Sequence, residues 1–248
     1  MKMAMLGTFL VGCNYGAVFG DCEVACHAPD QCPGGFGCGS ESLCRAAGAT
    51  QSCMAVLGDA HQSNDGSAGN TTVTLRQTID DVIAPNLTES CTNGDNTTGD
   101  MHWYRVFSLA QDGIPGTFHV DNVTFGVEQS VGQPQVAIAL GTYGGTFGAS
   151  TLDQTKIAPV VTSNVVVPAT TTGELVMQAF NQDIPGGAIL VVELDVADQT
   201  GTGRRVNIGL TTNAEARAGY ERSATCGPAV PSTTPSNKHL IITVTGRH

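Results

Sequence analysis

Residues 188–196 read AILVVELDV, and this stretch carries the clearest structural signal in the chain. Every second position is apolar, and Glu193 and Asp195 lie between the apolar residues Leu190, Val192, Leu194 and Val196. Successive side chains of a β-strand point to opposite faces, so the two carboxylates face water when the apolar set faces a core. The stretch therefore predicts a strand that is packed on one side only.

The same period of two recurs in other short segments, namely 102–109, 117–128, 135–140, 205–210 and 239–246. Turn-forming clusters such as Gly144-Gly145 and 185–187 separate them. Charged residues make up only 13% of the chain and glycines number 31, which favours strands joined by turns. Many short alternating strands without helical periodicity predict an all-β fold, an antiparallel sandwich or barrel.

Three local features add detail to this prediction. The pair Asp121-Asn122 shifts the phase within 117–128 and predicts a bulge or a tight turn. A short helix is the alternative to a strand around residues 214–222. In the segment 102–109, Trp103 shares a face with Arg105 and Phe107, so we expect Trp103 in the core and not on the surface as a stacking platform for sugars.

The nine cysteines are distributed unevenly along the chain. Six of them have the spacing C-x3-C-x5-C-x5-C-x5-C-x8-C: Cys22, Cys26, Cys32, Cys38, Cys44 and Cys53. The segment that holds them is rich in Gly and Pro and has almost no apolar core, so we expect three disulfides to stabilise it. The fifteen ways of pairing six cysteines stay open. Zinc and haem are disfavoured, because C-x2-C knuckles and the C-x-x-C-H motif are both absent.

Two further cysteines lie far apart, Cys91 before the first strong strand and Cys226 before the last. The first and last strands of a sandwich often lie close together, so we favour a Cys91–Cys226 disulfide. The alternative pairs Cys53 with one of these two and ties the small module to the sandwich.

The N-terminus has the layout of an export signal, since Lys2 precedes a short apolar run. The run ends in Leu-Val-Gly-Cys, which looks like a bacterial lipobox with Cys13 as the residue that receives lipid. After Cys13 no stretch is long and apolar enough to span a bilayer. We therefore expect a membrane to be contacted only through lipid on Cys13.

Two parts of the chain resemble known modules. The run DQCPGGFGC, residues 30–38, resembles the small cysteine-rich modules of secreted myxobacterial-type lipoproteins. The order of segments 103–107, 118–128, 188–193 and 239–244 resembles jelly-roll-type β-sandwich modules of secreted bacterial surface proteins. The resemblance implies a signal peptide over 1–12, a lipidated, disulfide-rich module over 13–53 and a jelly-roll-like sandwich over 54–248. It also implies a location on the bacterial outer membrane or cell surface, and it implies no activity.

The sequence contains few motifs that point to catalysis or to binding of a particular ligand. The net charge is -11 and there is no basic stripe, so nucleic acid is not an expected partner. The sequence has no G-x-S-x-G, no H-E-x-x-H and no phosphate-binding loop. The loop 93–100 offers oxygen ligands for a weak calcium site at Asp95, Asn96 and Asp100, although an Asx-rich turn is the simpler interpretation. No other cofactor is predicted.

These observations predict an exported, lipid-anchored, non-catalytic module for binding or adhesion, with a glycan or a protein as its ligand. The first alternative is a structural envelope protein that binds no ligand. A secreted hydrolase is the third candidate, after the binding module and the structural protein.

Overall fold

The structure is a computed structural model that describes residues 32, 34–38, 44–46 and 71–248. The chain divides into two compact units, residues 1–56 and residues 57–248. The predicted signal peptide lies outside the described residues, as do Cys13, Cys22, Cys26 and Cys53.

The small unit contains a two-stranded antiparallel sheet of β1 (Phe36–Cys38) and β2 (Cys44–Ala46). A disulfide joins Cys32 to Cys44, with the two Cα atoms 5.5 Å apart. Cys38 also belongs to a disulfide. The described part of the N-terminal unit therefore contains disulfides as expected, and Cys32–Cys44 is one of the pairings that the sequence left open.

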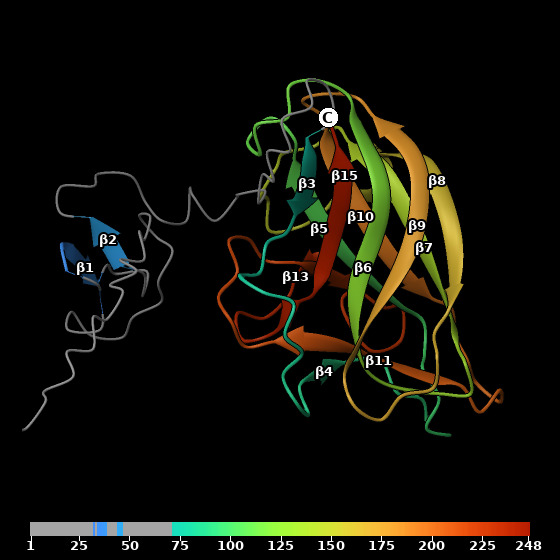
Figure 1. The fold of residues 1–248 in the computed structure, drawn as a ribbon. Helices are drawn as coiled ribbons and strands as arrows, with labels where there is room; N and C mark the ends of the chain where they lie inside the picture. The colour runs from blue at the N-terminus through green and yellow to red at the C-terminus, as the bar shows by residue number, and fades with distance from the viewer. Residues whose placement is uncertain (1–31, 33, 39–43, 47–70) are drawn as a thin grey trace, which may run out of the picture. The chain divides into compact units, whose positions relative to one another are not determined.

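The large unit is an antiparallel β-sandwich of two sheets, which Figure 1 shows as two layers. The six-stranded sheet has the order β13 (Ser232–Thr233), β12 (Tyr220–Arg222), β5 (Met101–Ser108), β10 (Ile189–Val196), β7 (Gln135–Tyr143) and β8 (Ile157–Val166). The main path of the other sheet is β14 (His239–Leu240), β11 (Arg205–Thr211), β6 (Phe118–Val131), β15 (Ile242–Arg247) and β3 (Thr72–Leu75). In addition, β4 (Thr88–Glu89) pairs with β11, and β9 (Glu174–Ile184) pairs with β6. The predicted all-β, jelly-roll-like sandwich is confirmed.

The core lies between the inner faces of the two sheets. The alternating set that predicted β10 is fully buried, whereas Glu193 and Asp195 of the same strand are only partly buried. The Trp103 side chain has no exposed surface, so its predicted place in the core is confirmed. Strand β3 pairs with β15, with Leu75 opposite Val244, so the first and last strands of the sandwich are neighbours.

The predicted bulge in 117–128 is confirmed at Asp121. In the pairing with β15 the register passes directly from Val120 to Asn122, so Asp121 is the extra residue. The register with β9 also shifts between Val120 and Asn122. The segment 214–222 contains no helix and ends in β12 instead. Within the described ranges the only helical element is the 3-10 turn η3 (Gln154–Lys156), and no helix there is long and apolar enough to cross a membrane.

Candidate functional site

The outer face of the six-stranded sheet carries two rows of mostly polar side chains. Strand register fixes both rows, because residues that are opposite each other on neighbouring strands point to the same face. The first row consists of Arg222, His102, Asp195, Ala137 and Asn164. The second row consists of Tyr220, Tyr104, Glu193, Ala139 and Thr162. Charged and aromatic groups therefore gather over β12, β5 and β10, and β7 contributes only small side chains.

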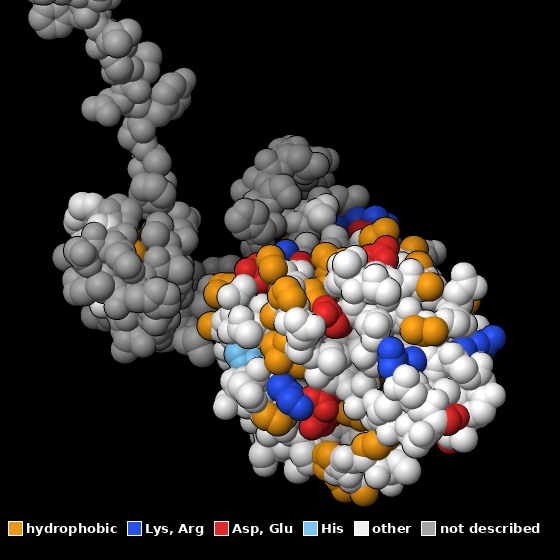
Figure 2. Space-filling model, turned by 90° about the horizontal axis from the view of Figure 1, so that it is seen from below, with side chains coloured by type: hydrophobic (Ala, Val, Ile, Leu, Met, Phe, Trp, Pro, Cys, Tyr) orange, Lys and Arg blue, Asp and Glu red, His pale blue; other side chains and the backbone are white. Residues whose placement is uncertain are grey.

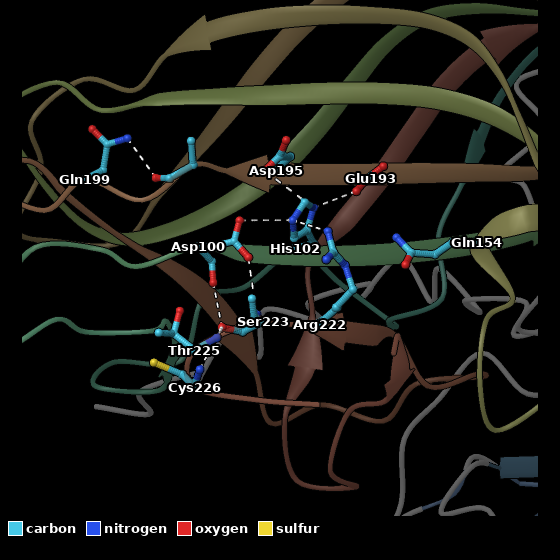
Figure 3. A network of polar contacts seen from close by, with 12 residues as sticks. Asp100, His102, Gln154, Glu193, Asp195, Gln199, Arg222, Ser223, Thr225 and Cys226 are labelled. Atoms are coloured by element: carbon cyan, nitrogen blue, oxygen red, sulfur yellow. Dashed lines mark hydrogen bonds and ion pairs between the residues drawn. The ribbon is translucent and has the colours of Figure 1, made fainter. Parts of the chain in front are cut away.

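His102 is the centre of this polar cluster, which Figure 3 shows from close by. Its Nδ1 lies 2.8 Å from Glu193 Oε1 and 3.5 Å from Asp195 Oδ1. Its Nε2 lies 3.4 Å from Asp100 Oδ1 and accepts a hydrogen bond from Arg222 Nη2. This arrangement assigns the ring proton to Nδ1, which donates to Glu193. One imidazole thus holds three carboxylates and one guanidinium in fixed positions.

The pKa values of the cluster shift in different directions. Burial lowers the pKa of His102, but the hydrogen bond to Glu193 and the charge of Asp195 outweigh burial, so this pKa lies above 6.5. Burial raises the pKa of Glu193, but the hydrogen bonds from His102 and Tyr104 outweigh it and hold this pKa below 4.5. At Asp195 burial dominates and raises the pKa of the carboxyl group. Glu193 is therefore the carboxylate that stays ionised at the lower pH.

Tyr104 extends the cluster into the second row. Its hydroxyl donates to Glu193 Oε1 at 2.8 Å and accepts from Gln154 Nε2 at 3.0 Å. Gln154 belongs to the turn η3, so this hydrogen bond ties the loop before β8 to the sheet face. Burial raises the pKa of Tyr104, which keeps the phenol protonated as a donor.

The Cys91–Cys226 disulfide supports the cluster from one side. Ser223 Oγ donates to the backbone oxygen of Asp100 at 2.7 Å and accepts from the backbone N–H of Cys226 at 3.0 Å (Figure 3). On the Cys91 side of the disulfide, the Gly99 N–H donates to the backbone oxygen of Cys91 at 2.8 Å. The disulfide therefore joins the segment that carries Asp100 to the segment that carries Arg222. It is the pairing that the sequence favoured, and Cys53 pairs with neither of these cysteines.

A cavity of about 190 Å³ lies on the same face of the sheet, beside Val106 and Tyr220. Phe147 and Arg217 also line it, with the Arg217 Cζ atom 4.3 Å from the centre of the Phe147 ring. Arg217 Nη2 donates to Gln111 Oε1 at 2.7 Å. Because Tyr220 is opposite Tyr104, this cavity adjoins the second row of the polar cluster.

The three residues of the expected calcium loop have separate partners. Asp95 Oδ2 accepts from the Gly201 N–H at 2.7 Å, and Asn96 Oδ1 accepts from Arg205 Nη1 at 2.7 Å. Asp100 belongs to the His102 cluster. Among the described residues, the carboxylate and imidazole atoms close enough to share an ion are those of Asp100, His102 and Asp195. Arg222 contacts the same imidazole, and its positive charge opposes the binding of a cation there.

A second histidine–carboxylate group lies on the other sheet and is simpler. His119 Nδ1 is 2.6 Å from Asp183 Oδ1, and its Nε2 is 3.7 Å from Asp121 Oδ1. Strands β5 and β6 belong to different sheets, so strand pairing does not bring His102 and His119 together. The face shown in Figure 2 mixes acidic, basic and apolar side chains and has no broad basic area.

No protein-family model matches the chain, and no curated protein sequence matches it. Among solved structures, it is similar to the crystal structure of the cysteine protease and lectin-like domains of Cwp84, a surface layer associated protein of Clostridium difficile. The identity is 10% and the TM-score is 0.42, and the match covers 60% of this chain and 32% of that chain. This likeness assigns neither domain's role to the chain, so a function has to be argued from the chain's own residues.

Proposed function

We propose that this protein is an exported, non-catalytic binding module that holds a polyhydroxylated ligand, of the glycan type, on the outer face of the six-stranded sheet. The observation that carries the proposal is the fixed His102 cluster beside a cavity lined by Phe147 and Tyr220. Carboxylates accept hydrogen bonds from paired hydroxyl groups, and aromatic rings pack against the apolar face of a sugar. The Asp195 side chain keeps 39% of its surface exposed, so it is accessible to such a ligand.

The contacts within the cluster favour binding over turnover. A general acid or base needs a group that is free to exchange a proton with the substrate. Glu193 Oε1 accepts hydrogen bonds from both His102 and Tyr104, and the second nitrogen of His102 accepts one from Arg222. A secreted hydrolase is the alternative. If the purified protein released products from a polysaccharide or a peptide, the hydrolase would be the correct function and the binding module would be refuted.

A binding measurement tests the site. We expect Asp195→Asn to weaken retention on immobilised envelope polysaccharides about tenfold, because it removes the charge of the carboxylate that is exposed to the ligand. The matched control is Asp183→Asn, which neutralises the histidine-paired carboxylate of the other sheet. Equal weakening by the control would contradict the assignment. If the wild-type protein bound no polysaccharide, that result would favour the structural envelope protein.

Export is supported by the disulfides of both units, since such bonds form and persist in oxidising compartments. We further propose attachment to the bacterial outer membrane or cell surface through lipid on Cys13, an assignment that stands on the sequence motif alone. The variant Cys13→Ser should move the protein from the membrane fraction to the soluble fraction. An unchanged membrane fraction would refute the anchor.

A further inference from the structure

Strand β8 (Ile157–Val166) ends the six-stranded sheet and pairs only with β7 within the described part of the chain (Figure 1). The Val167 N–H donates to the Pro134 oxygen, in the same register as the rest of the β7–β8 ladder. Hydrogen-bonded and non-hydrogen-bonded pairs alternate in an antiparallel ladder. The backbone N–H and C=O groups of Thr162, Asn164 and Val166 therefore point away from β7, toward the free edge.

Most of this edge lacks the features that usually keep an exposed strand unpaired. Natural proteins protect such edges with charged side chains, very short strands, proline or a bulge. The ten residues of β8 read IAPVVTSNVV and include no charge, and Val160 and Val166 are 36% and 53% exposed. Pro159 and the bulge at Val160, which has no partner on β7, protect only the first part of the strand, so residues 161–166 form the unprotected edge. The other terminal strands of the two sheet paths, β13, β14 and β3, have only two, two and four residues. Strand β9, which among the described strands pairs only with β6, is long but carries the charges of Glu174 and Asp183.

The sequence of β8 is nearly the same in both directions around Ser163. Residues 160–166 read VVTSNVV, so an antiparallel copy centred on Ser163 places Val160 opposite Val166 and Val161 opposite Val165. Thr162 then lies opposite Asn164, a polar pair on the exposed outer face. A two-fold axis at Ser163 also matches the hydrogen-bonding pattern of the free edge. The backbone groups of Thr162 and Asn164 that point away from β7 face each other and form a hydrogen-bonded pair.

From this self-complementarity we infer that β8 is a dimer interface, where two copies of the chain pair antiparallel about a two-fold axis at Ser163. The two six-stranded sheets join into one continuous sheet, and each copy supplies the same strand, as a closed two-fold interface requires. Because the net charge of each chain is -11, repulsion between the copies opposes the dimer at low ionic strength, and added salt strengthens it. The interface does not depend on the proposed ligand.

Sedimentation of the purified full chain over a concentration series tests the interface. The wild-type chain should dimerise reversibly, with a dissociation constant that falls as salt is added. Thr162→Asp with Asn164→Asp places like charges opposite each other at both symmetry-related pairs, and should raise the dissociation constant at least tenfold. Thr162→Lys with Asn164→Asp places a lysine opposite an aspartate of the second copy, and should return the constant to within about threefold of the wild-type value.

Two controls keep the outcome decisive. Thr72→Asp adds a charge to β3, an edge strand of the other sheet, and should leave the dissociation constant unchanged. Circular dichroism should show the same β-spectrum and cooperative unfolding for every variant. A wild-type chain that stays monomeric up to its solubility limit would overturn the proposal. So would a lysine–aspartate variant as weak as the double aspartate variant, or an equal loss in Thr72→Asp.

Discussion

Replacing both Cys91 and Cys226 with alanine should lower the free energy of unfolding of the sandwich by about 5 kcal/mol. The two cysteines are 135 residues apart in the sequence, so their bond closes a loop that spans most of the domain. In the chain-entropy model, the stabilisation comes from the restricted unfolded chain and grows slowly with loop length. Denaturant unfolding of the wild-type and double-alanine chains, both without reductant, measures the difference.

The disulfide of the small unit provides the matched control. Cys32 and Cys44 are only 12 residues apart and lie in the other compact unit, so Cys32→Ala with Cys44→Ala should leave the unfolding transition of the sandwich unchanged. A loss below about 1 kcal/mol in the Cys91–Cys226 variant would show that the unfolded chain is already compact without the bond. A similar loss in both double variants would show that the two units unfold together.

The same bond links stability to the candidate site. It lies between the backbone segment of Asp100 and the segment that runs from Arg222 to Cys226, and the Ser223 hydroxyl bridges them. Two of the groups around His102 therefore come from segments that the disulfide joins. This accounts for a polar cluster that is well fixed although it draws on β5, β10, β12 and a loop.

The long inner strands were predictable because one of their faces is buried and the other is not. Residues 188–196 and 135–140 alternate clearly, and both became central strands, β10 and β7. Strands β8 and β9 were not singled out, for a physical reason. Valine occupies both faces of β8, and polar Gln178 and Gln182 share the inward face of β9 with Phe180, so neither strand alternates cleanly.

The candidate site was predictable only in part. The alternation placed Glu193 and Asp195 on the outer face, and the structure finds them there. It could not bring His102 to them, because that depends on the register between β5 and β10, two strands far apart in the sequence. Arg222 was missed because β12 has only three residues, too few to show a period.

Glu215→Ala should lower the free energy of unfolding by about 3–5 kcal/mol and the thermal midpoint by about 10 °C. Its partner Arg105 lies on the core face that the alternation assigned to it and has no exposed surface. Arg105 Nη2 donates to Glu215 Oε2 at 2.7 Å, and the other donors reach Gln77 and the backbone oxygens of Arg217 and Leu240. Burial lowers the pKa of Arg105, and the carboxylate of Glu215 opposes that shift. Without the carboxylate of Glu215, the guanidinium charge of Arg105 stays buried with no counter-charge.

An exposed ion pair serves as the control that separates the effect of burial on stability from the effect of charge attraction alone. Arg247 Nη1 lies 2.7 Å from Asp121 Oδ1, the same separation, but these side chains are 41% and 31% exposed. Arg247→Ala should therefore cost at most about 1 kcal/mol. Replacing both members of the buried pair, Arg105→Met with Glu215→Leu, should be less harmful than Glu215→Ala, because no unpaired charge is left inside. If Glu215→Ala cost no more than Arg247→Ala, the carbonyl oxygens around Arg105 would be sufficient to hold its charge, and Glu215 would not be its essential partner.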